Sequence, residues 1–186
     1  MKKKYLIIAF IVTVLMQLSV PAMMIYDSEI TEKEGTAFKF KTVPIDPTDP
    51  FRGKYITLSY DIASYPTTDT TFTNGELVYV VLAKDEAGFA KIASVSHNKP
   101  KGTDEYVAAD VNFNYGGKLN LEFPFDRFYM NENKAADAET AYDEYSTKEN
   151  AKPAYAVVAV KEGNAVVKDV IVDGMPIKEY VEKNKP

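Results

Sequence analysis

The side chains best suited to chemistry lie in two short segments of the sequence. Residues 46–55 contain Asp46 and Arg52, and residues 127–134 contain Glu132. Two carboxylates can carry out acid–base chemistry or hold a cation through their oxygen atoms, and an arginine can bind a carboxylate through two hydrogen bonds. The two segments are therefore candidates for a binding site or, alternatively, for the carboxylates of an extracytoplasmic hydrolase or metal-dependent enzyme.

Other catalytic patterns are missing from the sequence, which has no Gly-x-Ser-x-Gly, no glycine-rich phosphate loop and no His-Glu-x-x-His. It contains no cysteine, which excludes thiol nucleophiles, thiolate-bound zinc and a lipid-modified cysteine. The single histidine, His97, follows a predicted strand, and we interpret it as a solvent-facing turn residue. We expect no cofactor and no metal, and we favour a binding role over an enzymatic one.

The first segment also has a purely structural interpretation. Pro44, Pro47 and Pro50 favour an extended approach, and Gly53 permits a turn with positive φ. Asp46 can accept hydrogen bonds from nearby backbone amides. The segment can therefore be a loop that leads into a core strand and binds nothing.

Charge and composition limit the classes of partner. Charged residues make up 26% of the chain and the hydrophobic set 46%, which is typical of a globular protein. The formal net charge is −5, and without the three lysines at 2–4 it is −5 − 3 = −8. Nucleic-acid binding needs basic patches, so we expect no nucleic-acid partner.

The N-terminal segment, residues 1–25, is predicted to be a transmembrane anchor. Residues 5–25 carry no charge and as a helix would extend about 32 Å, close to the hydrocarbon thickness of a bilayer. Lysines precede this run and acids follow it, so the positive-inside rule keeps the N-terminus in the cytoplasm. We predict a single-pass protein of the cytoplasmic (inner) membrane, with lipid around the helix and the domain on the extracytoplasmic or periplasmic side.

A cleaved secretory signal is the alternative. Val20-Pro21-Ala22 is similar to a small-residue cleavage site, and residues 5–18 would serve as its apolar region. The apolar run continues through Met23 and Met24 beyond that site, and we therefore favour an uncleaved anchor.

After a polar spacer at residues 26–35, the pattern predicts strands. Ile56, Leu58, Tyr60 and Ile62 alternate with polar residues and predict one half-buried strand. Three pairs of apolar segments separated by glycine-containing turns predict hairpins, namely 76–84 with 89–96, 107–113 with 119–123, and 154–161 with 165–172.

The fold class follows from these elements: a mainly β domain over residues 36–186, forming an antiparallel sandwich or partly open barrel. An alanine-rich segment, residues 134–147, predicts one amphipathic helix that covers the sheet. A weak repeat relates residues 79–84 to residues 155–160. It has two explanations: a division of the domain into two similar β units at about 36–123 and 124–186, or a chance likeness between alternating hairpins.

Gly53, Tyr55, Leu58 and Tyr60 reproduce, at the same spacing, a motif written Gly-Asp-Tyr-x-x-Leu-x-Tyr. Lys54 stands where the motif has aspartate. The chain thereby resembles the family of membrane-anchored bacterial proteins named for this motif, which has no established activity. The substitution by Lys54 puts in doubt any catalytic or metal-binding role of that aspartate.

The resemblance extends over nearly the whole chain, from the anchor to the turn at Val172-Asp173-Gly174. Residues 127–134 are similar to the family's aromatic segment before a helix, with Asn133 in place of glycine. Relatives are often encoded beside polytopic membrane proteins, which implies a membrane-protein partner. We therefore expect an extracytoplasmic binding or accessory domain in which residues 46–55 and 127–134 lie side by side, with Arg52 near Glu132 or Asp46. The candidate binding residues are Asp46, Arg52, Gly53, Tyr55, Tyr60, Tyr129 and Glu132.

Overall fold

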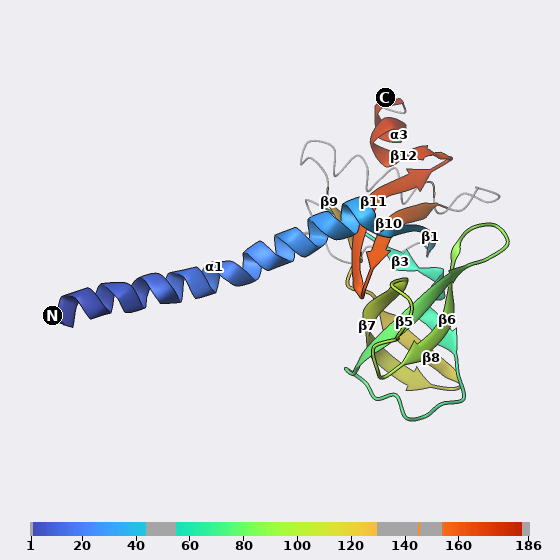
Figure 1. Cartoon of the computed structure of the whole chain (residues 1–186). Coiled ribbons are helices and arrows are strands. Elements are labelled where there is room, and N and C mark those ends of the chain that lie inside the picture. Colours follow the sequence, from blue (N-terminus) through green and yellow to red (C-terminus); the bar gives the residue numbers. More distant parts are fainter. Residues whose placement is uncertain (1, 44–54, 130–144, 146–153, 184–186) are drawn as a thin grey trace, which may run out of the picture.

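The computed structural model describes residues 2–43, 55–129, 145 and 154–183. One long helix leads into a mainly antiparallel β structure that nearly closes on itself and ends in a short helix (Figure 1). This confirms the predicted fold class.

The long helix, α1, runs from Lys2 to Glu34 and is long and apolar enough to span a membrane. Its apolar part lies away from the β domain, and Pro21 lies inside it. The helix ends against Gly35, whose N–H donates to the Thr31 carbonyl at 2.9 Å. Residues 26–34, predicted as part of a spacer, are the last turns of this helix. Their helical conformation was not predicted.

The strands form two five-stranded sheets and one two-stranded ribbon. The first sheet has the order β12 (Met175–Pro176), β11 (Asn164–Val172), β10 (Tyr155–Lys161), β1 (Thr36–Val43), β3 (Ser59–Tyr60). The second has the order β4 (Ser64–Pro66), β8 (Lys118–Glu122), β7 (Tyr106–Tyr115), β5 (Leu77–Lys84), β6 (Ala90–Ser96). The ribbon pairs β2 (Tyr55–Thr57) with β9 (Arg127–Tyr129).

The three predicted hairpins are confirmed as β5–β6, β7–β8 and β10–β11. Their alternation places one apolar face inside, as in β5, where Val78, Val80 and Leu82 are buried. Two parallel bridges connect the sheets, from Lys39 to Phe89 and from Val107 to Gly163. The inner faces of both sheets contribute to one apolar core.

The predicted single strand over residues 56–62 is only partly correct. The segment is divided into β2 and β3, and Asp61–Ala63 form a 3-10 helix, η1. The division occurs because β2 pairs with β9 whereas β3 pairs with β1, so the chain passes from the ribbon to the first sheet at Leu58. Period-two alternation reports which side chains face inward, but not which neighbour a strand pairs with.

The hairpins that carry the weak repeat share a structural detail. Strand register shifts between Val81 and Leu82 in β5, and between Val157 and Val158 in β10, both at the same offset of 157 − 81 = 76 residues. Their other neighbours differ, because β5 pairs with the later strand β7 and β10 pairs with the earlier strand β1. The similarity is therefore found between the two hairpins β5–β6 and β10–β11. The division of the domain into two units stays a prediction.

The predicted covering helix at residues 134–147 lies outside the described residues, except for Tyr145. That residue is helical and buried, and its ring meets the Tyr180 ring at 5.9 Å. Tyr180 belongs to α3 (Ile177–Lys183), a short helix that the sequence analysis did not predict and that buries Ile177 and Val181.

Candidate functional site

The motif strand and β9 form the first part of the candidate site. Tyr55 lies opposite Tyr129, and Thr57 lies opposite Arg127, in an antiparallel pair. The end of the first candidate segment and the start of the second are therefore neighbours in the ribbon β2–β9. This adjacency is a property of the backbone, and it does not define a shared site.

Beyond the ribbon, the motif segment is built into the core. The Leu58 N–H donates to the Asp126 carbonyl at 2.7 Å, and the Leu58 side chain is buried. The Tyr60 ring is buried as well, and its hydroxyl donates to the Phe125 carbonyl at 2.7 Å. These two hydrogen bonds fasten the motif to the chain between β8 and β9.

Tyr60 also belongs to a cluster of four aromatic rings. The other three rings are those of Phe40 in β1 and of Phe123 and Phe125 in the β8–β9 connection. The ring centroids within the cluster lie 5.1–6.1 Å apart. Tilted and edge-on ring pairs at such distances add to the stabilisation from burial. Tyr60 therefore joins the first sheet to the β8–β9 connection.

The other predicted site residues separate into two groups. Asp46, Arg52, Gly53 and Glu132 lie outside the described residues, together with the predicted Arg52 ion pair and the positive φ of Gly53. Tyr129 is described and 64% exposed at the end of β9. The alternative enzyme would use Asp46, Arg52, Tyr55 and Glu132. Of these four residues only Tyr55 is described, in β2, so the alternative stays a prediction.

The match to a family model covers residues 17–170, which is most of the chain, and the model is that of the GDYXXLXY protein family. The chain belongs to the GDYXXLXY family. No curated protein and no solved structure matches this chain. In this GDYXXLXY family member, the last two motif residues, Leu58 and Tyr60, are buried in the core, and the Tyr60 hydroxyl is hydrogen-bonded there. The loop for which a structural interpretation was given lies before them, outside the described residues.

A polar cluster that the sequence analysis did not connect surrounds His97, after β6. Its imidazole stacks on Phe72 at 4.5 Å, its Nδ1 lies 2.5 Å from Glu76 Oε1, and its Nε2 lies 3.0 Å from the Thr71 hydroxyl. The His97 side chain is 39% exposed, so the expected turn histidine faces solvent but has partners. No local sequence signal connects these residues, because they come from two separate loops.

The hydrogen bonds of this cluster favour a structural role. The Thr71 hydroxyl donates to Asp69 at 2.7 Å and thereby lowers the pKa of Asp69, while the Thr73 backbone N–H and then His97 lower the pKa of Glu76. Since the single Thr71 proton points to Asp69, it is not placed for removal by His97, as a nucleophile would require. The cluster ties the loop before β5 to the end of β6.

Cation binding finds no support among the described residues, which contain no group of three His, Cys, Asp or Glu side chains that could hold a metal. An open groove of about 370 Å³ lies where α1 meets β11, lined by Met24, Ile25, Ser28, Glu29, Glu32 and Val166. Its open shape and mixed lining are typical of a contact surface rather than of an enclosed small-molecule site.

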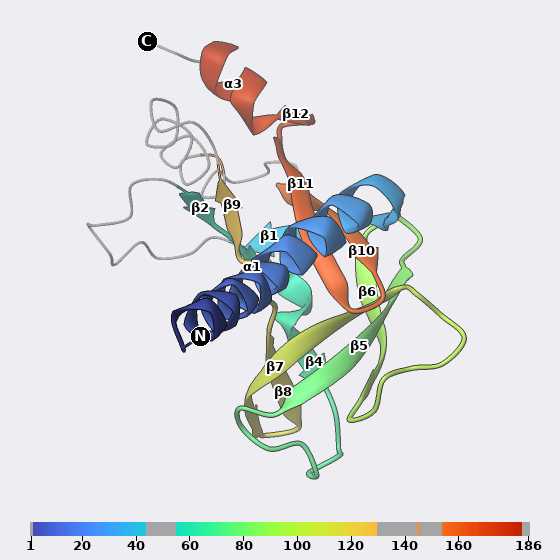
Figure 2. The ribbon, with the colours of Figure 1, turned by 60° about the vertical axis from the view of Figure 1, so that its left-hand side comes forward.

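The end of α1 is docked on the hairpin β10–β11 (Figure 2). Thr31 is 1% exposed at this joint, and Lys168 donates to the Glu32 carbonyl at 3.1 Å. The Lys161 ammonium binds the Glu34 carboxylate, and this hydrogen bond lowers the pKa of Glu34. The helix and the β domain are thus joined by direct packing, without an irregular linker.

Proposed function

We propose that this protein is a membrane-anchored binding or accessory module that works beside another membrane protein on the extracytoplasmic side. In this proposal α1 crosses the cytoplasmic membrane with the N-terminus inside. The lysines before the apolar run and the acids after it, among them Asp27 and Glu29, support that orientation.

The observation that carries the proposal is the docked joint between α1 and the hairpin β10–β11. A domain on a flexible tether can reach a soluble ligand in any orientation. A domain whose helix packs directly on its own sheet presents the same surface to the membrane plane at all times. Fixed presentation lowers the entropy that binding costs when the partner is itself held in the membrane.

Surface features that would suit a protein partner are present beside the joint and on the second sheet. Beyond α1, the large apolar side chains that are exposed among the described residues are Leu77, Phe113, Tyr115 and Tyr129. Leu77 begins β5, while Phe113 and Tyr115 end the neighbouring strand β7. Singly exposed apolar side chains are common on globular proteins, so the open groove at the helix base is the surface feature that best suits a protein partner.

The test is affinity capture of the full chain from solubilised membranes of the producing cell. One variant carries four flexible Gly/Ser residues between Tyr26 and Asp27, which interrupts α1 ahead of the docked joint. A matched control carries the same insertion at Glu86, in the exposed β5–β6 turn.

We expect one membrane protein to copurify with the wild type and with the control, and its yield to fall by roughly tenfold with the interrupted helix. Both variants should remain in the membrane fraction. Equal capture by all three chains, or no membrane protein with the wild type, would overturn the proposal.

A further inference from the structure

In the interior of the apolar run of α1, the side-chain amide of Gln17 is not satisfied. Gln17 lies near the middle of the uncharged run, and no hydrogen bond joins its amide to any other residue that the structure describes. Pro21, four residues later in the helix, has no N–H to donate to the Gln17 main-chain carbonyl. The regular helix hydrogen bond to the Gln17 carbonyl is therefore missing, and the Gln17 side-chain amide needs a partner from elsewhere.

The threonine and serine hydroxyl groups of this segment differ from the Gln17 amide in that respect. Thr13 donates to the Ala9 carbonyl at 3.0 Å, and Ser19 donates to the Met16 carbonyl at 2.8 Å. Each hydroxyl is satisfied inside its own helix. At about 1.5 Å per residue, Gln17 lies about 12 Å from the outer end of the apolar run. Its amide is therefore too deep to reach the headgroup region.

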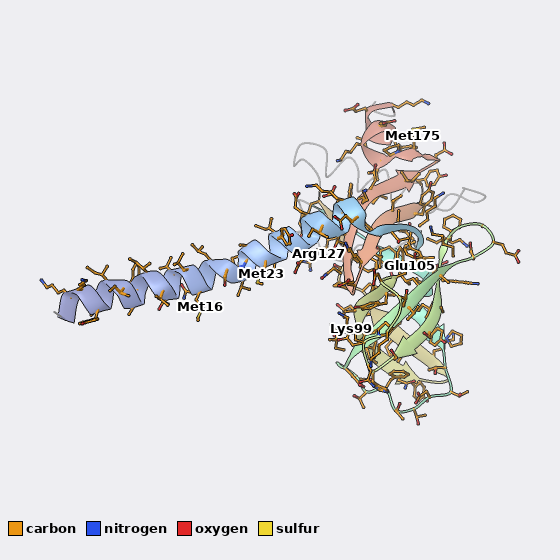
Figure 3. The ribbon with its side chains drawn as sticks, in the orientation of Figure 1. Met16, Met23, Lys99, Glu105, Arg127 and Met175 are labelled. Atoms are coloured by element: carbon orange, nitrogen blue, oxygen red, sulfur yellow. The ribbon has the colours of Figure 1, made fainter. Side chains whose placement is uncertain are left out.

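Hydrocarbon offers no hydrogen bonds, and in it an unsatisfied side-chain amide costs several kcal/mol. In membranes, polar side chains of this kind usually hydrogen-bond across a contact between two helices, and small residues on the same face allow the backbones to approach. Ala9 and Thr13 precede Gln17 at intervals of four and supply that face. Figure 3 shows Met16 and Met23 on the same stretch of α1, away from the β domain, so the domain leaves this part of the helix uncovered.

We propose that Ala9, Thr13 and Gln17 form the face on which a transmembrane helix of the partner protein docks, with the Gln17 amide as its hydrogen-bonding centre. This rests on the proposed function, because it requires α1 to span the membrane. The partner helix carries a small residue and a hydrogen-bond donor at the depth of Gln17.

Charge argues that the occupant is a different chain and not a second copy. A parallel pair of copies would place the lysines at 2–4 beside one another and would also bring together two domains of net charge −8, from −5 − 3. Like charges at both ends oppose such a pair.

The test is site-specific photo-crosslinking of the full chain in membranes of the producing cell. A crosslinker at Thr13 lies on the proposed face, and one at Leu15 lies at nearly the same depth on the opposite face. We expect an adduct with a membrane protein of another mass from Thr13 and not from Leu15.

In Gln17→Leu the adduct from Thr13 should fall by roughly three- to thirtyfold, the effect of losing one or two interhelical hydrogen bonds. Gln17→Asn should restore part of it. In the double variant Gln17→Leu/Leu15→Gln, which has the same composition, the adduct at Thr13 should stay low, because the amide has moved to the other face.

Four results would overturn this inference: no adduct from Thr13, adducts of equal yield from both faces, an adduct that does not respond to Gln17→Leu, or an adduct with the mass of two copies. Alkaline extraction of the same membranes separates this failure from that of the proposed function. If the chain stays in the membrane but forms no adduct from Thr13, only the docking face is wrong. If the chain is extracted, the anchor itself is wrong.

Discussion

The hydroxyl of Tyr60 donates a hydrogen bond to the main-chain carbonyl of Phe125, 2.7 Å away, inside the core. The two residues are 65 positions apart in the sequence. Through this contact the last residue of the family motif connects the first sheet to the segment that leads into β9. The motif tyrosine thus has a structural role that can be measured separately from any binding role of the residues before it.

Removing only the Tyr60 hydroxyl should lower the stability of the domain. In Tyr60→Phe the ring cluster is retained, but the buried Phe125 carbonyl loses its donor, which costs about 1–3 kcal/mol. Urea unfolding of both proteins measures the difference. Tyr115→Phe, at a residue 84% exposed, is the matched control and should unfold like the wild type. If Tyr60→Phe does so too, the hydrogen bond contributes nothing.

Gly35 permits the close approach between the end of α1 and β10. A Cβ atom there would lie 2.4 Å from the Thr31 carbonyl oxygen and 3.0 Å from the Val160 carbonyl oxygen, both of which are main-chain atoms. Gly35→Ala should therefore destabilise the joint by roughly 1–3 kcal/mol, as overpacking does elsewhere. Proteolysis after Lys33 should become faster, whereas Ala37→Ser, at an exposed position of β1, should leave the rate unchanged. An unchanged rate in Gly35→Ala would mean that the joint tolerates a methyl group.

The carboxylate of Glu76 should make stability depend on pH. Hydrogen bonds from the Thr73 backbone N–H and from His97 lower the pKa of Glu76 from its ordinary value of 4.5. A carboxyl group whose pKa is lowered in the folded state stabilises the fold at pH values above its ordinary pKa. This contribution is lost as the pH falls through the lowered pKa.

Glu76→Gln should therefore melt below the wild type at pH 7, and the two melting temperatures should converge as pH falls below 4.5. Glu86→Gln, at an exposed turn residue, is the control and should match the wild type throughout. A difference between Glu76→Gln and the wild type that stays constant down to pH 3 would contradict the assignment.

The hairpins were predictable because their information is local. Alternation identifies the buried face of β5, and the glycine in its turn, Gly88, has the positive φ of 81° that such a turn needs. The division of the motif strand was not predictable, since pairing with β9 or β1 depends on residues far away in the sequence. The helical form of residues 26–34 was also missed, because only Thr31 is fully buried there and gives no apolar stripe.

The candidate site was predictable only as segments. The sequence placed Tyr55 and Tyr129 in two separate motifs, and their backbone pairing comes from the course of β9. The cluster around His97 draws Thr71 and Glu76 from a loop more than 20 positions earlier. Contacts of this kind depend on the packing of loops on the sheet, which no periodic pattern encodes.

The proposed function requires the N-terminus to lie in the cytoplasm and the β domain to lie on the outer side of the membrane. Since the sequence has no cysteine, a single introduced cysteine can report the side of the membrane. We expect Glu86→Cys, in the exposed β5–β6 turn, to react with an impermeant maleimide on intact spheroplasts. We expect Lys4→Cys to react only after the membrane has been opened. Labelling of Lys4→Cys on intact spheroplasts, with Glu86→Cys protected, would contradict the account.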